Sequence, residues 1–218
     1  MAEKGTGRPR AYLLADGSRV PSVTTVLNRW KESGGLLQWA FQRGKSGAES
    51  LYEDRAPLDI GTLVHSCVEA DIHGAPHPVI PPEYEERVIS AYSAWRDWWN
   101  GTPFEIVATE VPLVSERHRF AGTIDAVMKT PNGLAIGDWK TSAAVYADYL
   151  LQLAAYKILW DEARPDDPIT GGYHLMRFSK QHGDFEHRYF PEAADAERQF
   201  LLLLEAYRLD RELKKRVK

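Results

Sequence analysis

The chain has 218 residues, of which 44% are hydrophobic and 27% charged, with a net charge of −4. This composition predicts a soluble globular protein with one core, a single domain over residues 1–218. The one cysteine, Cys67, excludes an internal disulfide and a cysteine-ligated iron–sulfur cluster. Residues 1–10 lack an apolar stretch, and no apolar run could span a membrane, so we expect a cytoplasmic protein.

The acidic balance argues mildly against nucleic-acid binding, which usually requires a basic face. However, the positive charges cluster towards both ends of the chain. They are Lys4, Arg8 and Arg10 near the beginning, and Lys214, Lys215, Arg216 and Lys218 near the end.

The first 60 residues contain signals for short elements. Asp16–Gly17 between two short apolar runs predicts a small hairpin. Ser22 or Thr24 can cap a short helix that continues through Arg29, and a second helix is expected over residues 36–42. We expect residues 1–10 to be flexible and residues 11–60 to form an N-terminal helical region.

Two longer helices are expected next. In the first, Ile60–Ile72, His65 and Glu69 lie four residues apart and therefore share a face. A lone histidine in this setting is typically a packed or solvated residue, and Glu69 is more typical of an orienting partner than of a ligand. After a proline-rich loop, Glu83–Trp99 carries an aromatic stripe that is expected to pack in the core rather than stack on bases.

Three strands follow. Phe104–Leu113 carries Glu110, which could be either a site carboxylate or an ordinary edge-strand charge. Phe120–Lys129 and Leu134–Thr141 are joined by Pro131–Gly133, whose residues favour a turn, so they form a hairpin.

The hairpin carries an unusual set of charges. Asp138 and Lys140 are two residues apart on one strand and therefore point the same way, and Asp125 on the partner strand can lie beside them. Two carboxylates and an ammonium on a small patch of sheet are costly unless a divalent cation compensates them. This pattern predicts a metal-dependent phosphodiesterase site.

The remaining sequence completes an α/β (α+β) fold. A helix over 144–160 carries Gln152 and Tyr156 on one face, two strands are expected within 169–190, and a long helix covers 191–218. The expected buried stripe of the first of these helices is Leu150, Leu151, Ala154, Ile158 and Leu159. The order of elements predicts a central mixed sheet flanked by helices.

Three motifs together resemble the PD-(D/E)xK nuclease superfamily: Gly122–Asp125, Asp138–Lys140 and Gln152-x-x-x-Tyr156. Gly61–His65 fits the upstream histidine of the RecB-type exonuclease branch. The opening at Pro21–Leu27 is similar to phage-encoded members and to mitochondrial genome maintenance exonucleases. The resemblance implies a restriction-endonuclease-like core with its catalytic part at 104–178, and a substrate path along 11–60.

The resemblance also implies roles for the site residues. His65, Asp125 and Asp138 would bind Mg²⁺ or Mn²⁺, as one ion or two. Asp125, Asp138 and Lys140 would form the catalytic set, with Lys140 orienting the attacking water and either deprotonating it or stabilising the developing charge. A base role for Lys140 would require its pKa to be lowered.

Gln152 and Tyr156 would contact DNA, again as the resemblance implies. The leading hypothesis is an exonuclease of single-stranded or end-opened DNA in recombination, repair or phage DNA metabolism. The alternatives are a structure-specific endonuclease on the same fold and a catalytically silent DNA-binding module of a recombination or replication complex. A helicase or recombination partner and an oligomeric form are compatible with each hypothesis.

Overall fold

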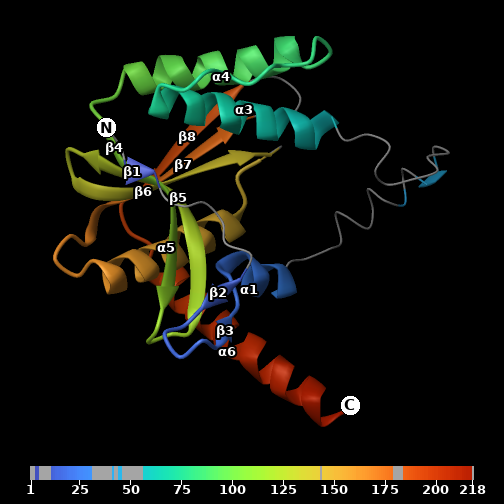
Figure 1. Cartoon of the computed structure of the whole chain (residues 1–218), viewed down its shortest axis with the longest axis vertical. Helices are drawn as coiled ribbons and strands as arrows, with labels where there is room; N and C mark the ends of the chain where they lie inside the picture. Colours follow the sequence, from blue (N-terminus) through green and yellow to red (C-terminus); the bar gives the residue numbers. More distant parts are fainter. Residues whose placement is uncertain are drawn as a thin grey trace.

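The protein is built around a mixed six-stranded sheet with helices on both faces (Figure 1). The computed structural model describes residues 3–4, 11–30, 41, 44–45, 56–142, 144–178 and 184–217. In spatial order the strands are β1 (Glu3–Lys4), β4 (Glu105–Ser115), β5 (Phe120–Thr130), β6 (Gly133–Thr141), β7 (Ile169–Phe178) and β8 (Phe185–Phe190). The expected mixed sheet flanked by helices is confirmed. The helix expected over 36–42 lies outside the described residues apart from residue 41.

The strand directions follow from the connections. β4, β5 and β6 form a consecutive antiparallel meander, and β7 and β8 form an antiparallel pair. β6 and β7 are parallel because α5 (Ala147–Ala163) crosses over between them. The predicted turn between β5 and β6 is confirmed, and Gly133 supplies its left-handed residue with φ +113°.

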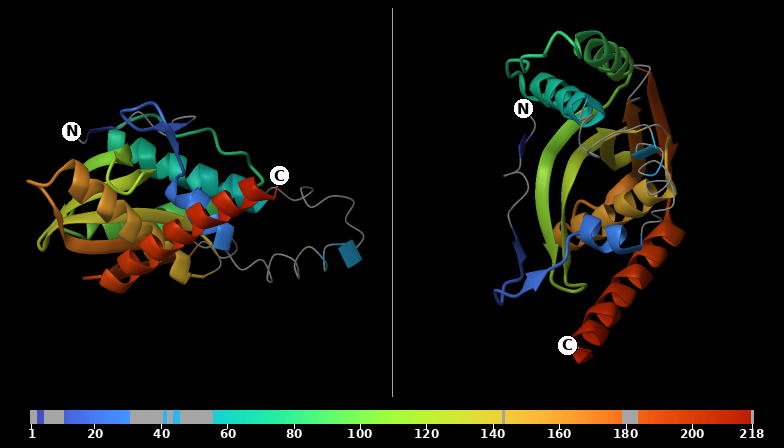
Figure 2. Two further views of the ribbon diagram at one scale, coloured as in Figure 1. Left: turned by 90° about the horizontal axis from the view of Figure 1, so that it is seen from below. Right: turned by 90° about the vertical axis from the view of Figure 1, so that its right-hand side faces the viewer.

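Two layers of helices cover the sheet, as Figures 1 and 2 show. α3 (Ala56–His73) and α4 (Glu85–Asn100) lie over one face, and their core includes the predicted aromatic residues Tyr92 and Trp95. α5, α1 (Val23–Trp30) and α6 (Ala194–Arg216) lie over the other. Among the described helices, none combines the length and apolar character needed to cross a membrane.

α5 differs from the expected amphipathic helix. It is buried well beyond a single stripe, including Gln152, Leu153 and Tyr156, because the sheet, α1 and α6 surround it. An apolar stripe is a signature of a helix with one solvent-exposed face, and α5 has little such face.

The N-terminal hairpin packs beside the first residues of β5. β2 (Tyr12–Leu13) and β3 (Arg19–Val20) pair antiparallel, as predicted. The Tyr12 hydroxyl lies 2.8 Å from the Thr123 hydroxyl on β5. Ser22 caps α1, accepting a hydrogen bond from the Thr25 amide at 3.1 Å, which confirms its predicted role.

Candidate functional site

Three carboxylates stand side by side on the neighbouring strands β4, β5 and β6. The residues on either side of Glu110 pair with those on either side of Asp125, so these two side chains lie opposite each other. Between β5 and β6, Ala126 pairs with Gly137, which places Asp125 next to Asp138 as well. The strand register therefore places Glu110 beside the predicted site. From the sequence alone, Glu110 could have been either a site carboxylate or an ordinary edge-strand charge.

The backbone bends where these carboxylates meet. Glu110 has φ +49°, a left-handed conformation that is uncommon for any residue with a side chain. Ala108 and Val111 lie three residues apart yet join the same core cluster, and so do Ile124 and Val127. Regular strands would send such pairs to opposite faces. In both β4 and β5, the regular alternation of side chains between the two faces of the sheet is therefore interrupted at the site.

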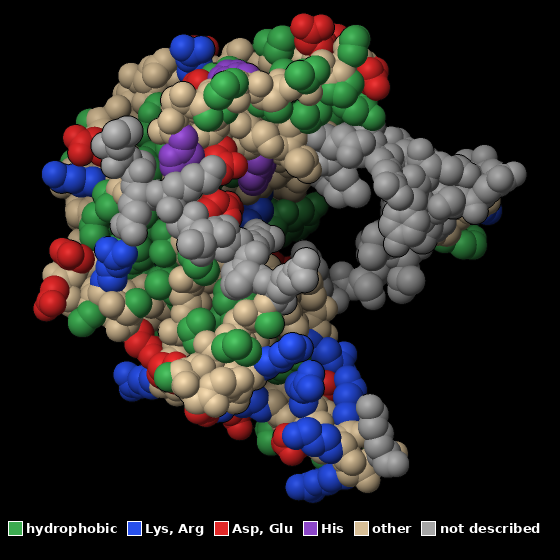
Figure 3. Space-filling view, viewed as in Figure 1, with side chains coloured by type: hydrophobic (Ala, Val, Ile, Leu, Met, Phe, Trp, Pro, Cys, Tyr) green, Lys and Arg blue, Asp and Glu red, His purple; other side chains and the backbone are tan. Residues whose placement is uncertain are grey.

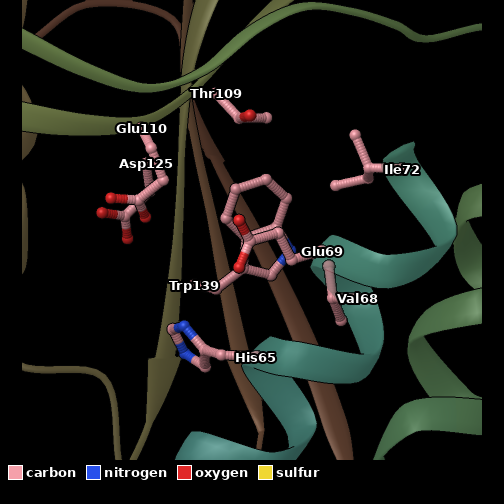
Figure 4. Close-up of a pocket in the computed structure, with 8 residues that line it drawn as sticks. All are labelled: His65, Val68, Glu69, Ile72, Thr109, Glu110, Asp125 and Trp139. Carbon is pink, nitrogen blue, oxygen red and sulfur yellow. The ribbon is translucent and has the colours of Figure 1, made fainter. Parts of the chain in front are cut away.

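A cavity opens between this bend and α3. On the face shown in Figure 3, histidine and acidic side chains gather below α3. The cavity is lined by His65, Val68, Glu69 and Ile72 of α3, Thr109 and Glu110 of β4, Asp125 of β5 and Trp139 of β6. Figure 4 shows the carboxylates of Glu110 and Asp125 next to each other, with the ring of His65 extending from α3 towards the same side.

A histidine outside the predicted set holds α3 against β4. His73 Nε2 lies 2.8 Å from the Thr109 hydroxyl, directly before Glu110 in the chain. α3 continues to His73, whereas the sequence placed this residue in the following loop. Its helical spacing of eight residues from His65 was the one signal that could have identified it.

Asp138 is the most deeply buried of the three carboxylates. It is 0% exposed, and neither of its oxygen atoms accepts a hydrogen bond of ordinary geometry. Burial, with the nearby charge of Asp125, raises the pKa of Asp138 to about 7, although the charge of Lys140 opposes the rise. The Lys140 ammonium forms an ion pair with Asp138, with Nζ 2.5 Å from Oδ2.

Lys140 is held in its charged form. Burial alone would lower its pKa, but the negative charges of Asp138 and Asp125 outweigh burial and raise the pKa above its ordinary value. Its ammonium also lies 5.5 Å from the centre of the Tyr149 ring on α5. The surroundings thus favour an ammonium that orients and stabilises, rather than a neutral amine.

Gln152 and Tyr156 lie apart from the cavity of Figure 4. They are 7% and 2% exposed, and Gln152 Nε2 donates a hydrogen bond of 2.7 Å to the Tyr156 hydroxyl. Tyr156 lines a neighbouring hollow together with Tyr12 and Thr123. Their contact with DNA stays a prediction.

The carboxylates fit a hard divalent cation. Asp138 presents two fully buried carboxylate oxygen atoms, of which Oδ2 is ion-paired with Lys140, and Oδ1 could coordinate a cation. Within the described ranges, no three His, Cys, Asp or Glu side chains already converge as a ligand set. Because Mg²⁺ usually keeps several waters and takes one or two carboxylates, Asp125 and Asp138 would suffice to hold it.

Comparison with known proteins places this site in a family context. A family model described as the PD-(D/E)XK nuclease superfamily matches residues 36–215. A crystal structure from Eubacterium rectale, named as a candidate exonuclease, is similar with a TM-score of 0.45 and 11% identity, over 75% of this chain and 68% of that one. The structure of SSO0001 is similar with a TM-score of 0.31 and 17% identity, over 66% and 71%. No curated protein matches the chain.

Proposed function

Because the chain belongs to the PD-(D/E)XK nuclease superfamily, we propose that it is a divalent-metal-dependent DNA exonuclease of the RecB-type branch. Its substrate is single-stranded or end-opened DNA, and its role lies in recombination, repair or phage DNA metabolism. The observation that carries this proposal is the row of Glu110, Asp125 and Asp138 on three adjacent strands, next to the ammonium of Lys140.

The proposed ligands are His65, Asp125 and Asp138, with Glu110 adjacent to them. A bound Mg²⁺ or Mn²⁺ would neutralise phosphate charge and activate water for attack. Oxygen ligands suit both ions, and the imidazole nitrogen of His65 makes Mn²⁺ as suitable as Mg²⁺. The charges support this assignment, since Asp125 and Asp138 share the single ammonium of Lys140 and a cation would balance the second carboxylate.

Lys140 supplies the positive charge that the protein itself contributes. Its ammonium sits at the edge of the carboxylate row, 2.5 Å from Asp138. There it can hold the attacking water or a phosphate oxygen and stabilise negative charge as the phosphodiester reacts. Tyr156 would contact the DNA from the neighbouring hollow, with Gln152 holding its hydroxyl group through their hydrogen bond.

The proposal is tested by digestion of end-labelled single-stranded, duplex and circular DNA with Mg²⁺, Mn²⁺ or EDTA. We expect metal-dependent loss of linear strands, abolished in Lys140→Ala but retained in Lys129→Ala, which removes an exposed lysine of β5. Cleavage that survives in Lys140→Ala would contradict the site assignment.

The circular substrate separates two modes of cleavage. An exonuclease leaves a single-stranded circle intact, whereas a structure-specific endonuclease opens it. If no substrate is cut with any metal while DNA still binds, the protein is a DNA-binding module rather than an enzyme.

A further inference from the structure

We propose that a single DNA strand runs from the carboxylate site along a basic groove between the β2–β3 hairpin, α1 and the C-terminal half of α6. The groove would bind the strand several nucleotides away from the bond that is cut. This inference rests on the proposed function for the identity of its occupant.

The groove begins beside the carboxylates. Thr123 precedes Asp125 by two residues on β5, a separation of about 7 Å along a strand. It lines the hollow that also contains Tyr156. If the phosphate of the bond to be cut lies at Asp125, the adjoining nucleotides of the DNA therefore reach this hollow.

Two larger hollows continue from the first one. The second shares Tyr12 and Ser22 with the first, and the third shares Tyr207 and Arg211 with the second. Their volumes of about 600 and 400 Å³ lie in the range of about 300–1,000 Å³ that is usual for ligand sites. Shared walls make the three hollows one path from β5 to the end of α6.

Positive charge lines the part of the path that is farthest from the site. In Figure 3, lysine and arginine side chains gather around the C-terminal half of α6. The lining cations are Arg19, Arg29, Arg211, Lys214 and Lys215. Arg29 and Lys214 share one carboxylate, Asp210, at 2.9 and 2.8 Å. Among the described residues, Arg19 and Arg211 form no salt bridge, so the groove carries surplus positive charge.

Helix stability alone does not explain this charge. Basic residues at the C-terminus of α6 complement the helix dipole, which accounts for Lys214 and Lys215. It does not account for Arg19 on β3 or Arg29 on α1, which come from other elements to line the same path. Cations gathered from three elements fit a polyanion that follows the groove.

The remaining lining favours a single strand over a duplex. The hydroxyl groups of Ser22 and Thr25 can donate to phosphate oxygens, and the aromatic residues Tyr12 and Tyr207 line the same hollow. Unpaired bases stack on such rings, whereas paired bases are already stacked on one another.

The test measures binding rather than cleavage. Fluorescein-labelled oligothymidylates of about 6 and about 20 nucleotides, chosen around usual site sizes of about 4–16 nucleotides, are titrated with protein in EDTA. The groove variant is Arg19→Ala/Arg211→Ala. The control is Arg87→Ala/Lys129→Ala, which removes the same charge from exposed positions on α4 and β5. Thermal melting confirms that both variants fold.

We expect the groove variant to weaken binding of the longer strand roughly tenfold, while the control stays close to the wild type. In the groove variant, the negative slope of log K against log salt should become less steep by about 1.4, which is about 0.7 for each of two lost phosphate contacts on a single strand. The wild type should gain more affinity than the groove variant when the strand is lengthened.

Three outcomes would each contradict the proposed groove. They are equal weakening of binding by the two variants, an unchanged salt slope in the groove variant, and a wild type that binds neither oligonucleotide. The result is separable from the proposed function. A protein that cuts nothing but binds the long strand through Arg19 and Arg211 retains the groove and loses the exonuclease assignment. If the protein cuts DNA but the groove variant binds the long strand as well as the wild type, the exonuclease assignment is retained and the groove is rejected.

Discussion

Asp138 and Lys140 compensate each other inside the protein, so removing one charge should harm the other. Lys140→Met leaves the fully buried carboxylate of Asp138 without its partner, so it should lower the free energy of unfolding by about 2–3 kcal/mol, somewhat less than for a fully buried pair because Lys140 is partly exposed. Asp138→Asn should cost less, because it removes a carboxylate whose charged form is itself disfavoured by burial. Urea unfolding in EDTA measures this loss.

The double variant provides the control for this prediction. Asp138→Asn/Lys140→Met removes both charges, so its loss of stability should be smaller than the sum of the two single losses. Strictly additive losses would show that the two side chains do not stabilise each other.

Glu110 combines backbone strain with a carboxylate in the cavity, and two substitutions separate these properties. Glu110→Gly removes a side chain from a residue with φ +49° and should raise stability by about 1 kcal/mol while reducing cleavage. Glu110→Gln keeps the strain and removes only the charge, so it should reduce cleavage without the gain in stability. Thermal melting beside a nuclease assay checks both, and a less stable Glu110→Gly would contradict the assignment of strain.

At the residue scale, the sequence indicated a metal-dependent phosphodiesterase site but did not identify every residue of that site. Asp125, Asp138 and Lys140 could be grouped because strand alternation and one short turn determine their neighbourhood. Glu110 could not, because its position opposite Asp125 depends on the register between β4 and β5 and on a bend at Glu110 itself. A single-residue shift of that register would have turned Glu110 away.

At the scale of elements, the contact between β5 and α5 depends on one glycine. A Cβ atom at Gly122 would lie 2.8 Å from Cε1 of Tyr156, and 3.2 Å from side-chain atoms of Leu159 and Val23. Gly122→Ala should therefore cost about 1–3 kcal/mol of stability, because these buried neighbours cannot move apart freely.

A matched glycine controls for the chemistry of this substitution. At Gly101 a Cβ atom would meet its nearest neighbour at 3.5 Å, an ordinary contact. Gly101→Ala should change stability by less than about 0.5 kcal/mol. Equal effects of the two variants in urea unfolding would show that β5 and α5 are not closely packed at Gly122.

The elements themselves were largely predictable because their signals are local. Strand alternation, turn residues and helix caps placed β4 to β8 and the long helices to within a few residues. α5 was predicted as a helix with one buried stripe, but its burial depends on α1 and α6, which approach from distant parts of the sequence. Local periodicity carries no information about such neighbours.

At the scale of the whole molecule, the layers join segments that the sequence keeps apart. Arg29 of α1 makes a two-bond contact with Asp210 of α6, at 3.0 and 2.9 Å, across 181 positions in the chain. This contact holds together two walls of the proposed groove. The sequence showed basic residues towards both ends of the chain, and only the fold brings Arg19, Arg29 and Arg211 to one path.

The buried His174 of β7, which faces His187 of β8, should make the stability of the whole molecule depend on pH. His174 Nδ1 lies 2.9 Å from His187 Nε2, and burial followed by the neighbouring His187 lowers the pKa of His174 to about 4. The unfolded chain has an ordinary histidine pKa of about 6.5, so it binds more protons than the folded protein between about pH 6.5 and 4. The stabilising contribution of neutral His174 is therefore complete above about pH 6.5 and is lost as the pH falls towards 4.

The expected slope from His174 is at most about 1.4 kcal/mol per pH unit. Asp138 acts in the opposite direction, because its raised pKa makes the folded protein bind the extra proton as the pH falls through about 7. Comparison with His174→Phe isolates the histidine, since Asp138 is the same in both proteins and the Phe104 and Tyr189 rings can pack against phenylalanine. Urea unfolding in EDTA at about pH 7.5 and about pH 5 should give a change in stability on acidification that is more favourable in the variant than in the wild type, by up to about 2 kcal/mol. Identical changes in the two proteins would mean that His174 is protonated in the folded protein as readily as in the unfolded chain.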